Sequence, residues 1–316
     1  MRVAAVQMEA AVGDLDANLE MAERLAGDAV RAGAEWIVLP EFFTTGIGFV
    51  PELAEAALPP DGAATELLLD LARRHGVVIG GSFLCHDPDG HVRNAFLLAT
   101  PEGLAGRHDK DLPTMWENCF YVGGDDDGVL EAEGRSVGVA LCWELMRSQT
   151  ARRLRGRVDL VLAGSGWWSV MEWSPRALFR RLEARNAALA RRAAVSFSTY
   201  VGAPLAHAAH AGRLECAMPW TPLRYAGHFE GNTVVCDADG TVRAQRRWSD
   251  GEGVALADVT PERTAPLAEP PARFWLHRRG LVPALTWNYQ RLHGRPWYRR
   301  HVAGRPPRQA RRPAAV

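Results

Sequence analysis

The chain has 316 residues and no net formal charge, because 37 basic side chains balance 37 acidic ones. This balance argues against a dedicated nucleic-acid partner, and no apolar run approaches the roughly 20 residues that span a bilayer. Gln7, Glu9 and Asp14 come too early for a signal peptide, so we expect a soluble, cytoplasmic protein.

Sequence patterns predict alternating strands and helices along most of the chain. Short apolar runs indicate strands, and apolar residues recurring every 3.6 positions indicate helices. In chain order the predicted segments are a strand at 2–8, a helix at 15–34, a strand at 36–40, a helix at about 62–75, strands at 77–84, 92–100 and 136–143, a helical stretch at 144–156, a strand at 160–168, a helix at 176–192, and strands at 195–202, 232–245 and 253–259. This order predicts an α/β layered fold with a mixed sheet, in one domain over residues 1–270.

Residues 271–316 differ in composition, being rich in Arg, Pro and Trp. Trp275, Trp287 and Trp297 follow no regular spacing, so we expect an irregular extension. Aromatic side chains without an element to bury them favour packing against a partner subunit or along the outside of the domain. The end of the extension, residues 304–316, is predicted to be disordered.

Lys110 is the only lysine in the chain, and the other 36 basic residues are arginines. Arginine is planar and always charged, whereas lysine is a compact point charge whose pKa shifts when it is buried. A single lysine in such a chain is a candidate for a task that arginine cannot perform. Chance in an arginine-rich sequence is the alternative.

Cys142 lies at the end of the most strongly apolar predicted strand, directly before a helical stretch. A strand-to-helix turn can present a nucleophile above a sheet, and a helix N-terminus lowers a thiol pKa. The alternative is a buried structural thiol, which is what we expect of the other cysteines: Cys85, Cys119, Cys216 and Cys236. None of the five has the C-x-x-C spacing of a zinc site.

A cysteine nucleophile needs a base. Glu41 follows the strand WIVLP and is the best candidate, although acidic residues there are usually caps or ion-pair partners. His108 and His228 lie near other motifs and could line a pocket. His207 and His210 are three residues apart but lack the H-E-x-x-H motif of a metal pair.

Taken together, these motifs resemble the nitrilase superfamily of carbon-nitrogen hydrolases over about residues 2–260. The segments that carry the resemblance are VAAVQMEAAVGDLDANL, LPEFFTTGIGF with Glu41, HDKDLPTMWE with Lys110 and Glu117, VGVALCWEL with Cys142, RLEARNAALARRAAVSFSTYVG, and GHFEGNTVVCDADGTVRA.

The resemblance implies a four-layer α-β-β-α sandwich that forms a homodimer or larger homo-oligomer, with no metal or organic cofactor. It also implies catalytic roles. Glu41 would be the base, Cys142 the nucleophile, and Lys110 with the backbone N–H of Trp143 the oxyanion site. Glu117 would hold Lys110 or the substrate. The implied reaction is hydrolysis of an amide or N-carbamoyl bond in a small organic compound, through a Cys142 acyl-enzyme that releases ammonia or an amine.

The motifs point to more than one branch of the superfamily. K-D-L-P-T-x-x-E and C-W-E resemble the nitrile-cleaving branch, and P-E-F-F-T-T-G resembles the amidase and carbamoylase branches. The loops expected to form the substrate pocket contain Trp116, Trp143, Glu144, Trp167, Trp168 and His228. Their aromatic content favours an apolar or aromatic substrate group.

Three other functions remain as alternatives. Acyl transfer to an amine would use the same triad, so that only the product distinguishes it from hydrolysis. A catalytically silent binding protein is disfavoured, because Glu41, Lys110 and Cys142 are all present. A metallohydrolase is disfavoured by the lack of metal-ligand spacing.

Overall fold

The structure is a computed structural model that describes residues 1–308. Its strands are β1 (Arg2–Met8), β2 (Trp36–Val38), β3 (Val78–His86), β4 (Val92–Thr100), β5 (Gly103–Asp109), β6 (Val129–Ala132), β7 (Arg135–Leu141), β8 (Leu160–Ser165), β9 (Leu205–His210), β10 (Arg213–Ala217), β11 (Arg224–His228), β12 (Thr233–Cys236), β13 (Val242–Arg246) and β14 (Gly253–Asp258). The α-helices are α1 (Leu15–Arg31), α2 (Ala63–His75), α3 (Ser148–Leu154), α4 (Arg176–Val201) and α5 (Leu281–His301). Short 3₁₀ turns are η1 (Pro51–Glu55), η2 (Met115–Cys119), η3 (Cys142–Met146) and η4 (Trp248–Asp250).

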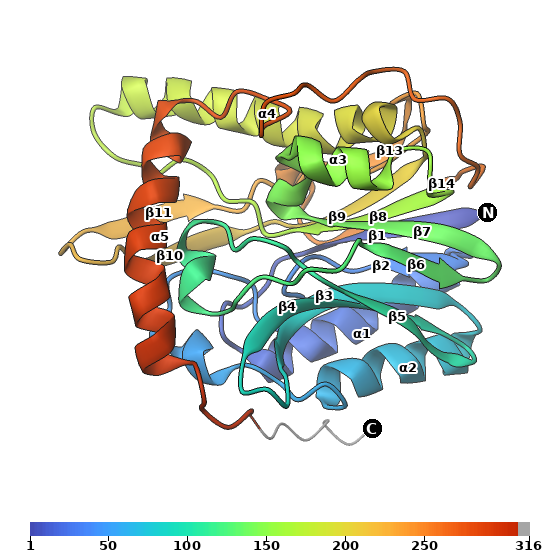
Figure 1. The fold of residues 1–316 in the computed structure, drawn as a ribbon, viewed down its shortest axis with the longest axis horizontal. Helices are drawn as coiled ribbons and strands as arrows, with labels where there is room; N and C mark the ends of the chain where they lie inside the picture. Colours follow the sequence, from blue (N-terminus) through green and yellow to red (C-terminus); the bar gives the residue numbers. More distant parts are fainter. Residues whose placement is uncertain (309–316) are drawn as a thin grey trace.

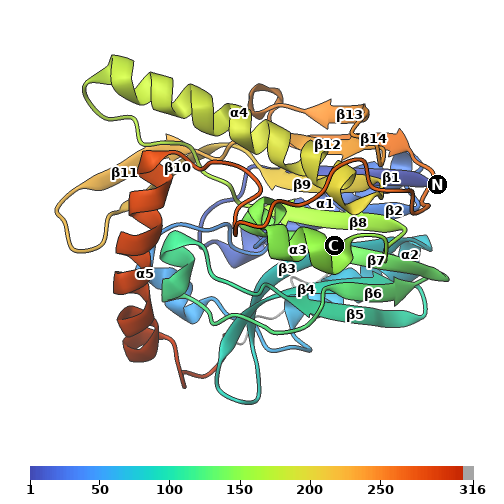
Figure 2. The same cartoon turned by 45° about the horizontal axis from the view of Figure 1, so that its top comes forward.

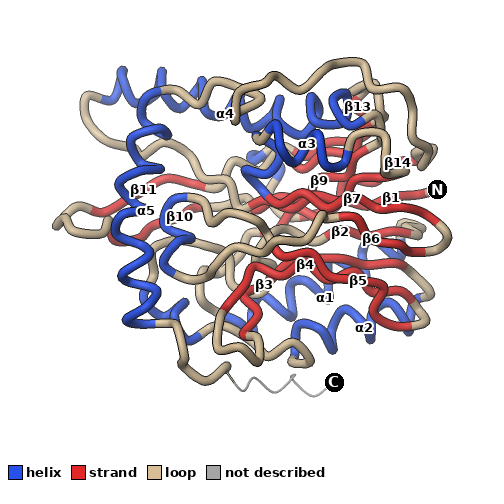
Figure 3. The backbone as a smooth tube through the Cα atoms, in the orientation of Figure 1, coloured by secondary structure: helices blue, strands red, loops and turns tan. Residues whose placement is uncertain are grey.

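Twelve strands form one mixed sheet whose main path runs β5-β4-β3-β2-β1-β9-β8-β7-β6. Strands β1, β2 and β3 are parallel, as are β7, β8 and β9, while hairpins close both ends of the path. Figure 1 and Figure 3 show the two halves of this sheet facing each other, with α1 and α2 outside one half and α3 and α4 outside the other.

Alternating side chains along the strands contribute to separate apolar cores. In β1, Val3 and Ala5 point into the core between the two sheet halves, whereas Ala4 and Val6 point toward α1 and α2. In β8, Leu162 joins the same central core. Because strand side chains alternate between faces, one strand contributes to two cores. This arrangement is the α-β-β-α sandwich, and the predicted fold is confirmed.

The predicted strand at 195–202 is wrong, because these residues form the last two turns of α4. Their β-branched and aromatic content favours a strand. However, Phe197 and Val201 lie four residues apart and are buried on the same face as Ala193 and Ala194, which is helical periodicity. The helix ends at Gly202, whose φ of 81° is the left-handed conformation typical of a helix end.

The expectation of an irregular extension after residue 270 is also wrong, because α5 forms within it. Pro283, Gly294 and Pro296 weaken the helical pattern in the sequence, and packing against the rest of the chain outweighs them. Figure 1 and Figure 2 show α5 running across one end of the sandwich, at the end opposite to the N-terminus. Most of the segment predicted to be disordered lies outside the described residues.

The tryptophans of this extension pack on their own chain. Trp275 and Trp287 contact each other edge to face and join the apolar core that includes Trp143. Trp297 packs edge to face against Phe49 and Phe120. Within residues 1–308, no helix has the length and apolar character needed to cross a membrane.

Candidate active site

Four of the residues predicted to be catalytic meet at the ends of separate elements. Glu41 follows β2, Lys110 directly follows β5, Cys142 directly follows β7, and Glu117 lies in η2. A carboxylate oxygen of Glu41, a carboxylate oxygen of Glu117 and the Cys142 sulfur all lie within 4.8 Å of one another. All four residues are buried. The structure therefore brings together, in one buried cluster, residues that are far apart in the sequence.

The Glu41 carboxylate is held by donors from three directions. Its Oε1 accepts hydrogen bonds from Lys110 Nζ at 2.7 Å and from Asn94 Nδ2 at 2.9 Å. Its Oε2 accepts from the backbone N–H of Gly166 at 3.1 Å, and its backbone carbonyl accepts from His210 Nε2 at 2.8 Å. These bonds fix the orientation of the carboxylate beside the cysteine.

A glycine allows β8 to approach this carboxylate-bearing segment. A Cβ atom on Gly164 would lie 2.7 Å from the backbone nitrogen of Glu41, a separation that real Cβ atoms do not show. The G-S-G sequence at 164–166 thus has a steric reason, since any side chain at its first position would push β8 away from Glu41.

Lys110 forms ion pairs with both carboxylates. Its Nζ lies 2.7 Å from Glu41 and 2.8 Å from Glu117, and both pairs are fully buried. Burial opposes the charged form of the lysine, but the two carboxylates outweigh burial, so the pKa of Lys110 is raised above its ordinary value. An ammonium has three donors, and within residues 1–308 these two carboxylates accept only two of them. The third is available to a substrate oxygen.

One carboxylate oxygen of Glu117 accepts several hydrogen bonds, and the other accepts none from the described residues. Its Oε2 accepts hydrogen bonds from Lys110, from the Thr114 backbone N–H at 2.9 Å and from the Tyr121 hydroxyl. Its Oε1 is buried and has no hydrogen-bond partner within the described part of the chain. Burial raises the pKa of Glu117 to about 7, although Lys110 opposes the rise.

Cys142 occupies a strained turn between β7 and η3. Its φ of 49° is in the left-handed region that is uncommon for a non-glycine residue, which is the geometry of a nucleophile elbow. Burial and the neighbouring Glu41 raise the pKa of the thiol well above its ordinary value. The expectation that the following helix would lower this pKa is therefore wrong, because η3 is a single short turn and burial dominates. The thiol must lose its proton to a base, and Glu41 is the adjacent one.

Cys142 opens onto a narrow pocket with a cavity volume of about 40 Å³. The predicted tryptophans Trp116, Trp143, Trp167 and Trp168 all line it, and Trp116 stacks on Trp168 with ring centres 4.4 Å apart. Among the described residues of the wall, none is Lys, Arg, Asp or Glu. The pocket is therefore suited to an apolar or aromatic, uncharged group.

Two residues predicted to bind substrate do not line this pocket. Glu144 is fully buried behind the cysteine, where it accepts hydrogen bonds from the backbone N–H groups of Leu141 and Asp111 and from His108 Nε2. Its role is to hold the turn, because its carboxylate faces the backbone rather than the pocket. His228 lies in a separate surface hollow, 4.0 Å from Glu183.

Several residues of the site lie outside the motifs recognised in the sequence. Asn94 is the third residue of β4, and His210, which was considered only as a metal ligand, ends β9. The pocket wall also includes Asn186 and, from α5, Thr286 and Gln290. None of these residues belongs to a local motif, and only the three-dimensional pairing of distant segments places them here.

Two side-chain clusters in the described residues have spacing compatible with a metal ion: Glu41, Glu117 and Cys142, and Glu183, His228 and Glu230. In the first, the Lys110 ammonium already provides the positive charge between the carboxylates. In the second, burial and then Glu183 raise the pKa of Glu230 to about 9, so a proton neutralises this carboxyl group. The lysine in the first cluster and the raised pKa of Glu230 in the second both weaken the attraction of these sites for a cation.

Comparison with known proteins agrees with this geometry. The profile of the carbon-nitrogen hydrolase family matches residues 2–269. The chain belongs to this family, the nitrilase superfamily. This carbon-nitrogen hydrolase acts on C–N bonds other than peptide bonds by a cysteine-based mechanism.

Individual relatives of this carbon-nitrogen hydrolase carry several activities. It is 33% identical over 192 residues to a nitrilase of Pyrococcus abyssi, covering 58% of this chain and 71% of the relative. It is 31% identical over 211 residues to the omega-amidase YafV of Yersinia enterocolitica, covering 66% and 71%. Among solved structures it resembles the amidase of Nesterenkonia sp. AN1, with a TM-score of 0.63 at 21% identity over 82% of this chain and 92% of that one.

Proposed function

We propose that this carbon-nitrogen hydrolase cleaves an amide or N-carbamoyl bond in a small, uncharged substrate, through a thioester on Cys142. The single observation that carries the choice of amide is the free, buried Oε1 of Glu117, a residue whose carboxylate belongs to the same cluster as the cysteine sulfur. An amide N–H can donate a hydrogen bond to this oxygen. A nitrile nitrogen carries no hydrogen and cannot donate one.

The proposed acylation begins with proton transfer from the Cys142 sulfur to Glu41. The sulfur attacks the carbonyl carbon, and the electron pair of the C=O bond moves onto oxygen. The third donor of Lys110 and the backbone N–H of Trp143, at the start of η3, stabilise this oxyanion. When the C=O bond reforms, the C–N bond breaks, and the leaving nitrogen takes the proton from Glu41.

Deacylation uses the same groups in the reverse order. Glu41 removes a proton from water, and the resulting hydroxide attacks the thioester carbon. The tetrahedral intermediate collapses to a carboxylic acid, and the sulfur takes back its proton from Glu41. Lys110 stabilises the second oxyanion as it did the first. The products are an acid and ammonia or an amine.

Nitrile hydrolysis is the second candidate, supported by the identity to the Pyrococcus abyssi nitrilase. Acyl transfer to an amine shares the same thioester and is distinguished only by its product. The experiment is ammonia release from a panel of amides, N-carbamoyl compounds and nitriles with apolar or aromatic groups, beside Cys142→Ala. We expect turnover of amides or N-carbamoyl compounds that Cys142→Ala loses by more than about 10³-fold.

The other outcomes are equally specific. Turnover of nitriles with none of the amides or N-carbamoyl compounds would replace the proposed function by the second candidate. New amide products on addition of amines, without free acid, would show acyl transfer. Undiminished turnover by Cys142→Ala would exclude the thioester.

A further inference from the structure

One wall of the catalytic pocket comes from a helix that lies outside the matched family region. Val282, Pro283, Thr286 and Gln290 of α5 line the same pocket as Cys142. They are spaced at helical intervals along one face, whereas the family profile ends at residue 269. This wall therefore belongs to the chain's own extension rather than to the matched core.

Gln290 is an unusual residue for such a wall. It is completely buried, yet neither Nε2 nor Oε1 of its side-chain amide has a hydrogen-bond partner within residues 1–308. A buried amide without partners is unfavourable, and such groups are rare in folded proteins. Thr286, one turn earlier on the same wall, differs because its hydroxyl donates to the Val282 carbonyl at 2.7 Å.

The helix holds Gln290 in place through contacts on both sides. Before it, Trp287 stacks on Trp143 with ring planes 8° apart and centres 5.4 Å apart. After it, Gly294 packs so closely on η2 that an added Cβ atom would lie 2.8 Å from the Asn118 carbonyl carbon. Gln290 thus sits on a docked segment, and its free amide is not explained by fraying of the helix.

We propose that Gln290 is a specificity-determining residue whose side-chain amide binds a neutral polar group of the substrate, remote from the bond that is cleaved. This inference rests on the proposed function. The group must offer both a donor and an acceptor, because Gln290 has one unpaired acceptor and an unpaired donor group. A primary carboxamide matches best, since two amides can form a pair of opposed hydrogen bonds.

Charged groups fit this subsite less well. A carboxylate accepts from Nε2 but leaves Oε1 facing another acceptor, and an ammonium leaves Nε2 facing another donor. In addition, the described wall contains no ionised side chain to pair with either. An alkyl end leaves the amide unpaired, as it is in the free enzyme.

The test uses three primary amides of equal length: hexanediamide, hexanamide and the monoamide of hexanedioic acid. We expect the wild-type kcat/KM to be highest for hexanediamide. In Gln290→Leu, hexanediamide should lose roughly ten- to hundredfold in kcat/KM, mainly through KM, while hexanamide keeps its value or improves. The unfolding temperature of Gln290→Leu should stay the same or rise, because no hydrogen bond is lost.

Asn288→Leu is the matched control, because it makes the same kind of amide-to-alkyl change on α5 at an exposed side chain that does not line the pocket. It should leave the ratio between the diamide and hexanamide unchanged. Turnover of hexanamide with the same ratio in wild type and Gln290→Leu would overturn this inference alone. A wild-type preference for hexanamide or the acid monoamide would do the same. No turnover of any of the three would overturn this inference, whereas the wider panel of amides and N-carbamoyl compounds decides the proposed function separately.

Discussion

The single lysine of the chain occupies a position that an arginine cannot fill. Its ammonium lies between two buried carboxylates at 2.7 and 2.8 Å, and in the proposed mechanism its third donor binds the substrate oxygen. A planar guanidinium is larger and directs its donors in a fixed fork, so it cannot meet both carboxylates and the oxyanion from this point. The chemistry of lysine thus explains why a chain with 36 arginines has a lysine at this position.

We therefore predict that Lys110→Arg keeps the positive charge and loses activity by about 10²- to 10³-fold in kcat, as expected when an oxyanion donor is misplaced. The measurement is kcat on the best substrate of the panel, with circular dichroism to verify folding. Arg93→Lys is the control, because Arg93 pairs with Asp87 and Asp89 away from the cysteine cluster. Equal kcat in Lys110→Arg and wild type would contradict the oxyanion role.

His108 supports the catalytic turn and makes folding stability depend on pH. Burial opposes its charge, but Glu144 and Asp126 on either side raise its pKa from 6.5 to about 9. Because the folded pKa lies above the unfolded one, this stabilisation is complete below pH 6.5 and is lost as the pH rises through 9. Because a pKa change of one corresponds to about 1.4 kcal/mol, the full contribution of His108 to the free energy of unfolding is of order 3 kcal/mol.

Urea denaturation between pH 6.5 and 9 tests this directly. The free energy of unfolding of the wild type should fall across that interval, and the fall should be smaller by about 3 kcal/mol in His108→Gln, which cannot be protonated. The fall that remains in the variant has another source, since the pKa of Glu230 is also raised to about 9. The same slope in both proteins would show that other groups cause it.

Some residues of the site can be recognised from a local sequence motif, and others only from the three-dimensional structure. Glu41, Lys110 and Cys142 were predictable because each lies at the end of a strand or just after one, and Glu117 was predicted from the family resemblance alone. Asn94 and His210 contact Glu41 through the pairing of strands distant in the sequence, which no local pattern encodes. The direction of the Cys142 pKa shift was missed because burial, a property of the whole fold, outweighs the adjacent helical turn.

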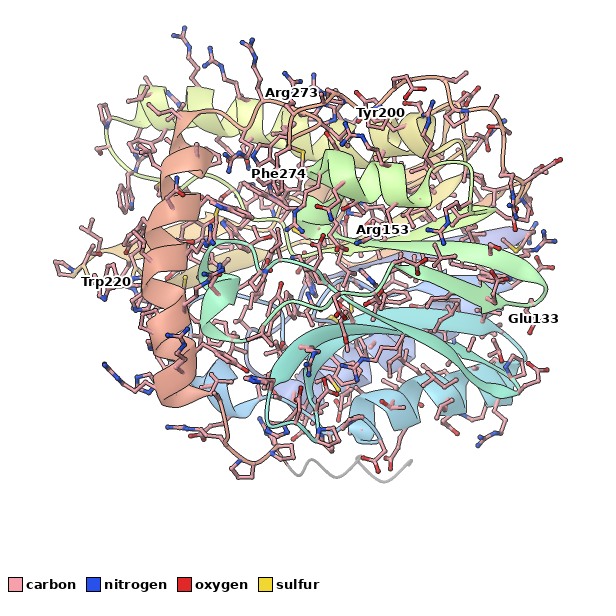
Figure 4. All side chains as sticks on the ribbon, in the orientation of Figure 1. Glu133, Arg153, Tyr200, Trp220, Arg273 and Phe274 are labelled. Atoms are coloured by element: carbon pink, nitrogen blue, oxygen red, sulfur yellow. The ribbon has the colours of Figure 1, made fainter. Side chains whose placement is uncertain are left out.

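Among the helices and strands, α5 is the element that the sequence pattern did not predict. Prolines and a glycine interrupt its pattern, and its exposed positions mix Leu281, Leu285 and Leu292 with four arginines, so the sequence shows no clear polar face. Its stability comes from contacts with η2, with Trp143 and with the hairpin of β10 and β11. Trp220, labelled in Figure 4, extends from that hairpin to contact Tyr289 and His293 of α5. Such long-range contacts cannot be derived from local propensity.

Gly294→Ala tests the docking of α5 on η2. Alanine favours a helix by about 1 kcal/mol over glycine, but here its methyl group would collide with the Asn118 and Cys119 backbone. We expect a net loss of about 1–2 kcal/mol in the free energy of unfolding, together with lower activity, because η2 carries Glu117. Urea denaturation and ammonia release measure the two effects.

Gly27→Ala is the control for this prediction. Gly27 lies in α1, where an added Cβ atom would meet only the flexible end of Arg31 at 3.2 Å. It should be neutral or stabilising by up to about 1 kcal/mol, with unchanged activity. Equal stabilisation at both positions would contradict close packing between α5 and η2.

For the whole molecule, the alternation of strands and helices was sufficient to predict the layers, because a sheet with apolar residues on both faces must be covered on both. That the one sheet folds into two facing halves was predicted only from the resemblance to the family. Assembly into a homo-oligomer remains a prediction that the single chain does not test. Light scattering during size-exclusion chromatography would measure the mass, and a monomer at micromolar concentration would contradict that prediction.

The central claim is that Cys142 carries the acyl group of an amide substrate. The most direct measurement is mass spectrometry of the enzyme after rapid acid quench during turnover of hexanamide or the best amide of the panel, followed by peptide mapping. We predict a hexanoyl or corresponding acyl adduct on the peptide that contains Cys142, absent from Cys142→Ala. An adduct on another cysteine, or turnover that persists in Cys142→Ala without any adduct, would contradict the account.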